Sequence, residues 1–267
     1  MKTTLTIAAA TAVLAASLSA MSHRQSLVAV NGRHVAHVAS STASGQRTPI
    51  LVELFTSEGC SDCPPADRVL MHLARKQPVE GADVVALGEH VDYWNNSRWR
   101  DAFSSPAFSR RQNEYADSFR LNSVYTPEMV VDGRWEFVGS DSNAAVDAIQ
   151  SAASAPHARL SMDETGGNVS VRVEGLPAAS GNPHLFVAFT EDGLTSRVRG
   201  GENAGATLLH WAVTRDLTDT GPVSTGDAAR TLPVPTEWRG RHLNVVAFVQ
   251  DVDDRRILGS AEIQDAG

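Results

Sequence analysis

Two cysteines separated by two residues are the side chains of this sequence best suited to chemistry. Cys60 and Cys63 are the only cysteines in the 267-residue chain, and residues 58–67 read EGCSDCPPAD. In the first turn of a helix, side chains three residues apart share a face, so both sulfurs can reach disulfide geometry. The free amides and the dipole at that helix end favour a thiolate on Cys60. The pair therefore predicts thiol–disulfide exchange, in which Cys60 attacks and Cys63 resolves the mixed disulfide.

The residues alone leave two other interpretations of this pair open. Asp62 lies between the cysteines and Glu58 just before them, and nearby carboxylates disfavour a thiolate, so the motif does not set the redox poise. The pair could be a structural disulfide in a partner-binding protein. It could also hold copper(I) or another metal, with His90 as the third ligand beside Cys60 and Cys63.

The elements that must position the cysteines are a strand before them and a helix after them. Residues 50–55 form a short apolar run, typical of a buried parallel strand, and residues 64–76 place apolar side chains at helical spacing. A second strand is expected over residues 84–91. His90 and Asp92 would project to one side at its carboxyl end, where sites commonly form, and His90 could relay a proton to or from Cys60.

The remaining chain is expected to divide near residue 155. Residues 49–155 are expected to have a thioredoxin-like order of elements. This order is completed by a helix over 103–119, a hairpin of 128–131 with 134–138 and a helix over 141–153. Arg111 is expected on the solvated outer face of the first of these helices. Residues 156–267 hold six strand-like stretches separated by Gly, Pro and Asn, which predicts a small antiparallel β-sandwich. The stretches are 157–162, 168–173, 185–190, 207–217, 243–249 and 256–263. The predicted fold class is thus α/β plus all-β.

Several stretches carry a resemblance to a known family. They are VELFTSEGC at 52–60, CPPAD at 63–67, HVDYW at 90–94, Arg111-Gln112 with Tyr115, Tyr125-Thr126-Pro127 leading to VVDG at 130–133, RGGEN at 199–203 and AFVQ at 247–250. The chain resembles an uncharacterised family of bacterial secreted thioredoxin-like proteins, a domain of unknown function with a GCxxCPPAD motif. The resemblance implies the fold but names no substrate. Residues 199–203 are interpreted as interdomain or loop structure.

The wider thioredoxin superfamily implies one more assignment. It places a cis proline against the active cysteines, and Thr126-Pro127 occupies the matching place before residues 128–131. The Thr126 backbone would then be free to pair with the extended chain of a substrate. No cofactor beyond a redox-active disulfide is implied.

The first residues of the chain predict export. Residues 1–20 are interpreted as a signal peptide, because Lys2 is followed by an apolar stretch over 5–16 and then by small residues. The apolar stretch is too short for a membrane span. Residues 21–48 read as a linker. A competing possibility is that Met21 is the true start and the protein is cytosolic. The predicted location is the periplasm or the exterior, with no stable membrane span after signal removal.

Charge restricts the partners. The chain has 23 basic and 31 acidic side chains, a formal charge of −8, and no basic block. Nucleic-acid binding is therefore not expected. With a single cysteine pair, the expected partner is an unidentified protein thiol or disulfide.

Overall fold

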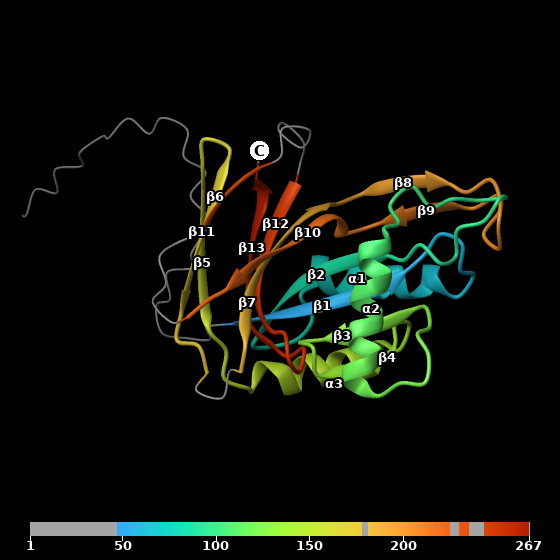
Figure 1. The fold of residues 1–267 in the computed structure, drawn as a ribbon. Helices are drawn as coiled ribbons and strands as arrows, with labels where there is room; N and C mark the ends of the chain where they lie inside the picture. The colour runs from blue at the N-terminus through green and yellow to red at the C-terminus, as the bar shows by residue number, and fades with distance from the viewer. Residues whose placement is uncertain (1–46, 178–180, 225–229, 235–242, 267) are drawn as a thin grey trace, which may run out of the picture. The chain divides into compact units, whose positions relative to one another are not determined.

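One eight-stranded mixed sheet runs through the described chain (Figure 1). The computed structural model describes residues 47–177, 181–224, 230–234 and 243–266. The strand order is β13-β12-β7-β10-β2-β1-β3-β4. Strand β2 runs parallel to both of its neighbours, β1 and β10, and every other neighbouring pair is antiparallel. The strands are β1 (Thr48–Thr56), β2 (Ala82–His90), β3 (Glu128–Val131), β4 (Trp135–Val138), β7 (Pro183–Glu191), β10 (Val213–Pro222), β12 (Leu243–Asp251) and β13 (Ile257–Ala266).

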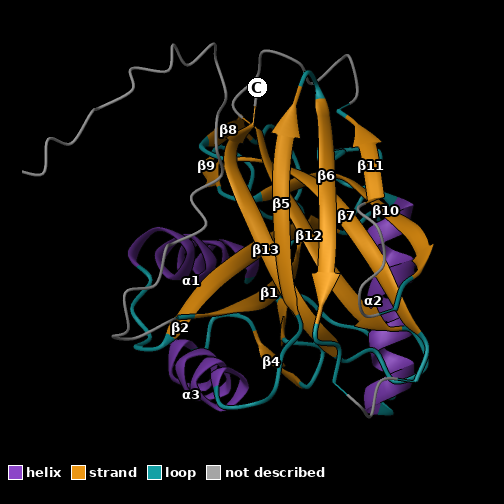
Figure 2. Ribbon diagram, turned by 90° about the vertical axis from the view of Figure 1, so that its left-hand side faces the viewer, coloured by secondary structure: helices purple, strands orange, loops and turns teal. Residues whose placement is uncertain are grey.

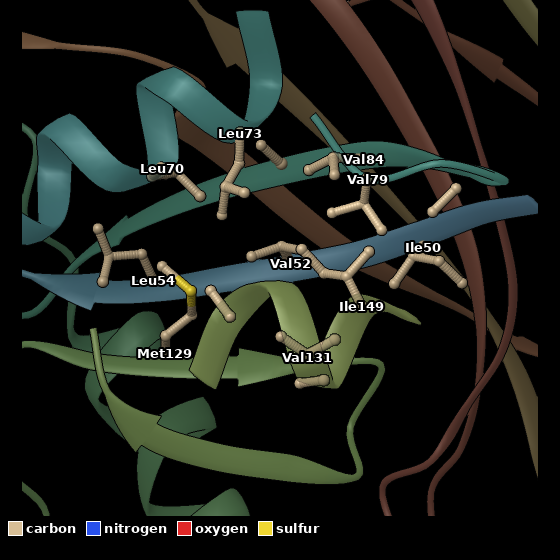
Figure 3. Packing of buried hydrophobic residues seen from close by; sticks show 14 of the residues in the cluster. Ile50, Val52, Leu54, Leu70, Leu73, Val79, Val84, Met129, Val131 and Ile149 are labelled. Atoms are coloured by element: carbon tan, nitrogen blue, oxygen red, sulfur yellow. The ribbon is translucent and has the colours of Figure 1, made fainter. Parts of the chain in front are cut away.

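Three helices cover the two faces of the amino-terminal half of this sheet. Helices α1 (Cys63–Lys76) and α3 (Ser142–Ala153) lie on one face and α2 (Pro106–Phe119) on the other (Figure 2). Apolar side chains of α1, α3 and β1 meet in a common core (Figure 3); they include Leu70, Leu73, Ile149, Ile50, Val52 and Leu54. Each large apolar side chain buried in this way contributes about 1.5–3 kcal/mol.

Local signals explain where the helices begin and end. Prolines occupy the first turn of α1, where their missing amides cost nothing, and the helix ends at Gln77 in a left-handed conformation with φ 48°. Ser105 caps α2 by accepting from the Ala107 amide, so this helix starts after residue 105 rather than at 103 as predicted. Asp141 caps α3 by accepting from the Asn143 and Ala144 amides.

The carboxy-terminal half adds two smaller sheets. Strands β5 (Arg159–Thr165), β6 (Asn168–Glu174) and β11 (Arg230–Pro233) form one, and β8 (Leu194–Arg197) with β9 (Thr207–His210) forms a hairpin. Apolar side chains of β5 and β6 pack with those of β7, β12 and β13 in a second core. The stretch predicted as one strand over 207–217 is two, because the backbone turns at Ala212 with φ 51°. Strands β8 and β11 were not predicted.

The large sheet crosses the predicted boundary at residue 155. Strand β2 pairs with β10, Val213 opposite Gly88, so strands from both sides of that boundary share one sheet. The fold is therefore mixed α/β with a large mixed sheet. The predicted signal peptide lies outside the described residues, as does the predicted linker except for residue 47 and Thr48, which begins β1. In the described part of the chain, no helix is long and apolar enough to span a membrane.

Candidate functional site

The cysteine pair lies where β1 gives way to α1, as predicted. Cys60 is in the turn after β1 and Cys63 is the first residue of α1, with the Cys63 amide donating to the Cys60 carbonyl at 3.3 Å. Both are free thiols, with exposures of 2% and 0%. One turn thus holds both sulfurs, three residues apart, just before and at the start of α1.

The surroundings shift the pKa values of the two thiols in opposite directions. A hydrogen bond from Cys63 is the largest cause that lowers the pKa of Cys60 to about 7, against burial, and Thr126 and the Asp62 amide add to it. Burial raises the pKa of Cys63 far above its usual value, and Cys60 and the Asp67 carboxylate add to that rise. Near neutral pH Cys60 is therefore the thiol of the pair that ionises, while Cys63 stays protonated.

The loop before β3 lies against Cys60. The Thr126–Pro127 peptide bond is cis, which confirms the expectation from the resemblance. The Cys60 sulfur lies 3.7 Å from the Thr126 carbonyl oxygen. The Trp94 indole donates to the Thr126 hydroxyl at 2.7 Å, so an aromatic side chain from the loop after β2 holds this residue beside the sulfur.

A loop from the second half of the chain clamps the cysteine turn. The Asn203 amide donates to the carbonyls of Glu58 and Cys60 at 3.0 and 2.8 Å. The Ser61 amide donates to the Glu202 carboxylate at 3.0 Å, which lowers the pKa of Glu202. The Gly-Glu-Asn stretch between β8 and β9 is thus part of the site and positions the backbone between the two sulfurs.

A hollow of about 420 Å³ adjoins this turn; it is lined by Gly59, Trp94, Asn96, Ser97, Arg98, Gly201 and Glu202. A larger hollow of about 540 Å³ lies near the end of α1, where Arg75, Trp211 and Glu262 contribute to its walls. Neither cysteine lines either hollow. The smaller hollow, which has Gly59 in its wall, is therefore the one that belongs to the cysteine site.

The other predicted site residues have different surroundings. His90 is buried and its Nδ1 lies 2.7 Å from an Asp101 oxygen, which together with other carboxylates raises the pKa of His90 against burial. Asp92 accepts from the Ser109 hydroxyl at 2.6 Å and so ties its loop to α2, not to the cysteines. Asp62 is exposed at the start of α1, and its side chain makes no capping hydrogen bond.

Glu58 is buried and fully partnered. Its two oxygens lie 3.0 Å from Trp99 Nε1 and 3.2 Å from His210 Nε2. Within the described ranges, no three His, Cys, Asp or Glu side chains are grouped so that they could hold a metal, and His90 pairs with Asp101 instead. The metal alternative with Cys60, Cys63 and His90 therefore has no assembled ligand set in this structure.

Three buried site residues were missed from the sequence. Asp67 accepts from the Thr56 hydroxyl at 2.8 Å, and burial raises its pKa. Asp101 and His210 complete a polar cluster with Glu58. Asp67 lies four residues after Cys63, on the same helix face, which was a usable signal. His210 had none, because it comes from a strand 150 positions away from the turn.

Arg111 is not on the solvated face of α2, so that prediction is wrong. It is 6% exposed, and its guanidinium contacts Glu53 at 2.6 Å, Gln250 at 2.9 Å and the Tyr115 hydroxyl at 3.1 Å. The reason is that α2 turns this face onto β1 and β12, where the buried Glu53 requires a cation. Glu89 lies 3.5 Å from the same guanidinium. Burial raises the pKa of Glu89.

Fold and site together define a class: a mixed α/β protein with an unequal pair of thiols at a strand-to-helix turn. The chain belongs to the family described as protein of unknown function (DUF1223), whose profile matches residues 51–250. It is similar to the crystal structure of protein AGR_C_4864 from Agrobacterium tumefaciens, with 26% identity and a TM-score of 0.69, over 83% of this chain and 96% of that one. None of the curated proteins compared with the sequence matches it.

Proposed function

We propose that this protein is an exported thioredoxin-like protein that exchanges thiols and disulfides with an envelope protein through Cys60 and Cys63. The observation that carries the proposal is a pair of free thiols at a strand-to-helix turn, with the Cys60 sulfur 3.7 Å from the Thr126 carbonyl oxygen beside the cis proline; the surroundings lower the pKa of Cys60 to about 7 and raise that of Cys63. An exchange protein needs one thiol that is ionised at neutral pH and one that stays protonated until the mixed disulfide forms. An inert structural pair requires no such difference.

The order β1-α1-β2, followed later by the β3–β4 hairpin and α3, supports the thioredoxin-like part of the proposal. So does the cis proline beside Cys60. Export rests on the composition of residues 1–20. The carboxy-terminal strands, which share two packed sheets, are proposed to serve as the β-sandwich that carries the Gly-Glu-Asn loop to the site.

The proposed cycle balances in two steps. The Cys60 thiolate attacks a disulfide of the partner, forms a mixed disulfide and releases one partner thiolate. Cys63 then gives up its proton to Asp67, attacks the Cys60 sulfur and releases the second partner thiolate. The partner gains two electrons and the Cys60–Cys63 pair loses two. Because the chain has no other cysteine, an external thiol must reduce the pair again.

The test is a reduction potential measured against glutathione buffers, together with partner trapping by two matched variants. A potential between about −120 and −270 mV is expected, the range of exchange proteins. A potential below about −300 mV is typical of structural disulfides and would overturn the proposal. Cys63→Ser is expected to accumulate mixed disulfides with envelope proteins, whereas Cys60→Ser is expected to trap none. Equal trapping by the two variants contradicts the assigned roles.

A further inference from the structure

Five titratable side chains lie together behind the cysteine turn; they are Glu58, Asp67, His90, Asp101 and His210. They come from the turn after β1, from α1, from the end of β2, from the loop before α2 and from β9. All five are nine-tenths or more buried as side chains. Such a cluster is costly to bury, so its arrangement calls for a physical explanation.

His210 is held in one orientation within this cluster. Its ring packs edge-on against the His90 ring at 5.0 Å and the Phe103 ring at 5.4 Å between centroids. Nε2 lies 3.2 Å from one Glu58 oxygen, while the other Glu58 oxygen accepts from Trp99. Because the carboxylate accepts at both oxygens, the proton of neutral His210 belongs on Nε2.

The other nitrogen of the ring is then a free proton acceptor. Nδ1 of His210 has no hydrogen-bond partner in the part of the chain that the structure describes, although it is buried. It lies 3.9 Å from an Asp67 oxygen, the carboxylate close enough to raise the pKa of Cys63. A lone pair buried against this carboxyl group is placed to receive a proton from it.

From this geometry we propose that His210 is the proton relay of the resolving cysteine, acting through Asp67. The inference rests on the proposed exchange function and adds the regulation of its second step. When Cys63 attacks the mixed disulfide, its proton passes to Asp67 and on to Nδ1 of His210. The sulfur electron pair forms the bond to Cys60, and the pair of the broken bond leaves on the partner sulfur as a thiolate.

The charges around His210 suit a proton held there. Once Nδ1 is protonated, the imidazolium lies between the Asp67 and Glu58 carboxylates, which offsets the cost of burying a cation. The facing His90 is paired with Asp101 at 2.7 Å, and Arg215 of β10 lies beyond Phe103, 5.3 Å from its ring centroid. The Glu58 and Asp67 carboxylates therefore lie nearest to the His210 nitrogens, at 3.2 and 3.9 Å, while the ring of His90, whose pKa is raised, despite burial, by its carboxylate neighbours, lies 5.0 Å away between centroids.

The experiment separates the two steps of exchange with 5,5′-dithiobis(2-nitrobenzoate) as the probe. Stopped-flow absorbance follows two releases of thionitrobenzoate, the first from attack by Cys60 and the second from resolution by Cys63. In His210→Gln, the amide can still donate to Glu58 but cannot accept the proton. We expect the second release to slow about 100-fold near pH 7 and to become steeply pH-dependent, with the first release unchanged. His184→Gln, which breaks a more exposed pair with Asp219, is the matched control.

A second variant tests whether the two groups act in one relay. Asp67→Asn keeps an acceptor for Thr56 but removes the base, and it is expected to slow the second release at least as much. The double variant should be no slower than Asp67→Asn alone, because a broken relay cannot be broken twice. The proposal would be overturned if the double variant slowed the second release by the product of the two single effects. It would also be overturned if the second release in His210→Gln kept the pH profile of the unaltered protein.

A measurement on the unaltered protein keeps the proposal testable if His210→Gln does not fold. Imidazole NMR at pH 7 should show that His210 gains a proton at Nδ1 when the dithiol is oxidised, and an unchanged ring would contradict the relay. Failure of the proposed function has a different signature. If the unaltered protein gives a single release, or if glutathione buffers cannot reduce its disulfide, there is no exchange to which a relay could contribute.

Discussion

Each cysteine owes its properties to residues that the motif does not reveal. Glu58 and Asp62, the acidic residues beside and between the cysteines, do not oppose the thiolate of Cys60 as their sequence positions suggest. Asp62 is exposed and contributes its backbone amide, which lowers the pKa of Cys60. Glu58 turns away and is bound by Trp99 and His210. The inequality of the thiols therefore comes from Cys63 itself and from burial.

Removing the Cys63 thiol should weaken the acidity of Cys60. In Cys63→Ala, the hydrogen bond that lowers the pKa of Cys60 is lost, so this pKa should rise from about 7 toward the ordinary value of 9.0. Thiolate absorbance at 240 nm, followed against pH, measures it. Cys63→Ser, which keeps a donor, should show a smaller rise. If the alanine variant leaves the pKa of Cys60 in place, the hydrogen bond is not its main cause.

Among the elements, the loop between β8 and β9 has the most specific role. Its Asn203 side chain holds two carbonyls of the cysteine turn at once. Gly200 permits this approach, because a Cβ there would lie 2.1 Å from the Arg98 carbonyl oxygen. The hairpin of the second half therefore supports the turn of the first half directly.

Truncating Asn203 should loosen the cysteine turn. Asn203→Ala removes the side-chain donor to the Glu58 and Cys60 carbonyls, of which the Cys60 carbonyl keeps only the Cys63 amide. This loss costs about 1–3 kcal/mol of unfolding free energy and should expose Cys60 to faster alkylation by iodoacetamide. Urea unfolding and alkylation rates at pH 7 measure the two effects. Asn113→Ala, which removes an exposed hydrogen bond within α2, is the control and should change neither. Equal alkylation of both variants would argue against the clamp.

The buried face of α2 provides a second test at this scale. Arg111→Met leaves Glu53 buried without its cation and should lower the unfolding free energy by about 3–5 kcal/mol. The neighbouring Arg110 is exposed on the same helix, so Arg110→Met should change it by less than about 0.5 kcal/mol. Denaturant unfolding of both variants measures the difference. Similar losses would mean that Arg111 contributes through helix propensity alone.

For the molecule as a whole, buried carboxyl groups make stability depend on pH. Burial raises the pKa of Glu128 to about 7, above its ordinary value of 4.5. Folded protein then binds more protons than unfolded chain between these values, so stability falls as the pH rises through this window. Glu128→Gln should reduce this fall, by about 1.4 kcal/mol for each unit of pKa difference. Urea unfolding from pH 4.5 to 8 measures it, with exposed Glu80→Gln as the control. Parallel curves would contradict the prediction.

The shared sheet predicts that the first half does not fold by itself. A fragment of residues 47–155 lacks β10 beside β2 and lacks Gln250 beside the buried Arg111. It also lacks both residues that bind the cysteine turn from the second half, Asn203 and Glu202. Circular dichroism should therefore show no cooperative thermal transition for the fragment. A cooperative transition would show that the predicted domain boundary at residue 155 separates two independent folding units.

The sequence by itself determined the local features of this protein. Apolar spacing located the three helices to within a few residues, and the position of Cys60 and Cys63 between a strand and a helix followed from it. These signals act within a few residues, so one sequence is enough to read them. The place of Thr126–Pro127 beside Cys60 needed the resemblance in addition.

Only the tertiary structure decided which residues surround the dithiol. Asn203, Glu202 and His210 come to Cys60, Ser61 and Glu58 from more than 140 positions away. Arg111 turned out to be buried because Glu53 and Gln250 meet on strands that the sequence does not show to be in one sheet. Local periodicity carries no information on pairing at such separations. The two cysteines could thus be found in the sequence, whereas their unequal pKa values, set by burial and by each other, could not.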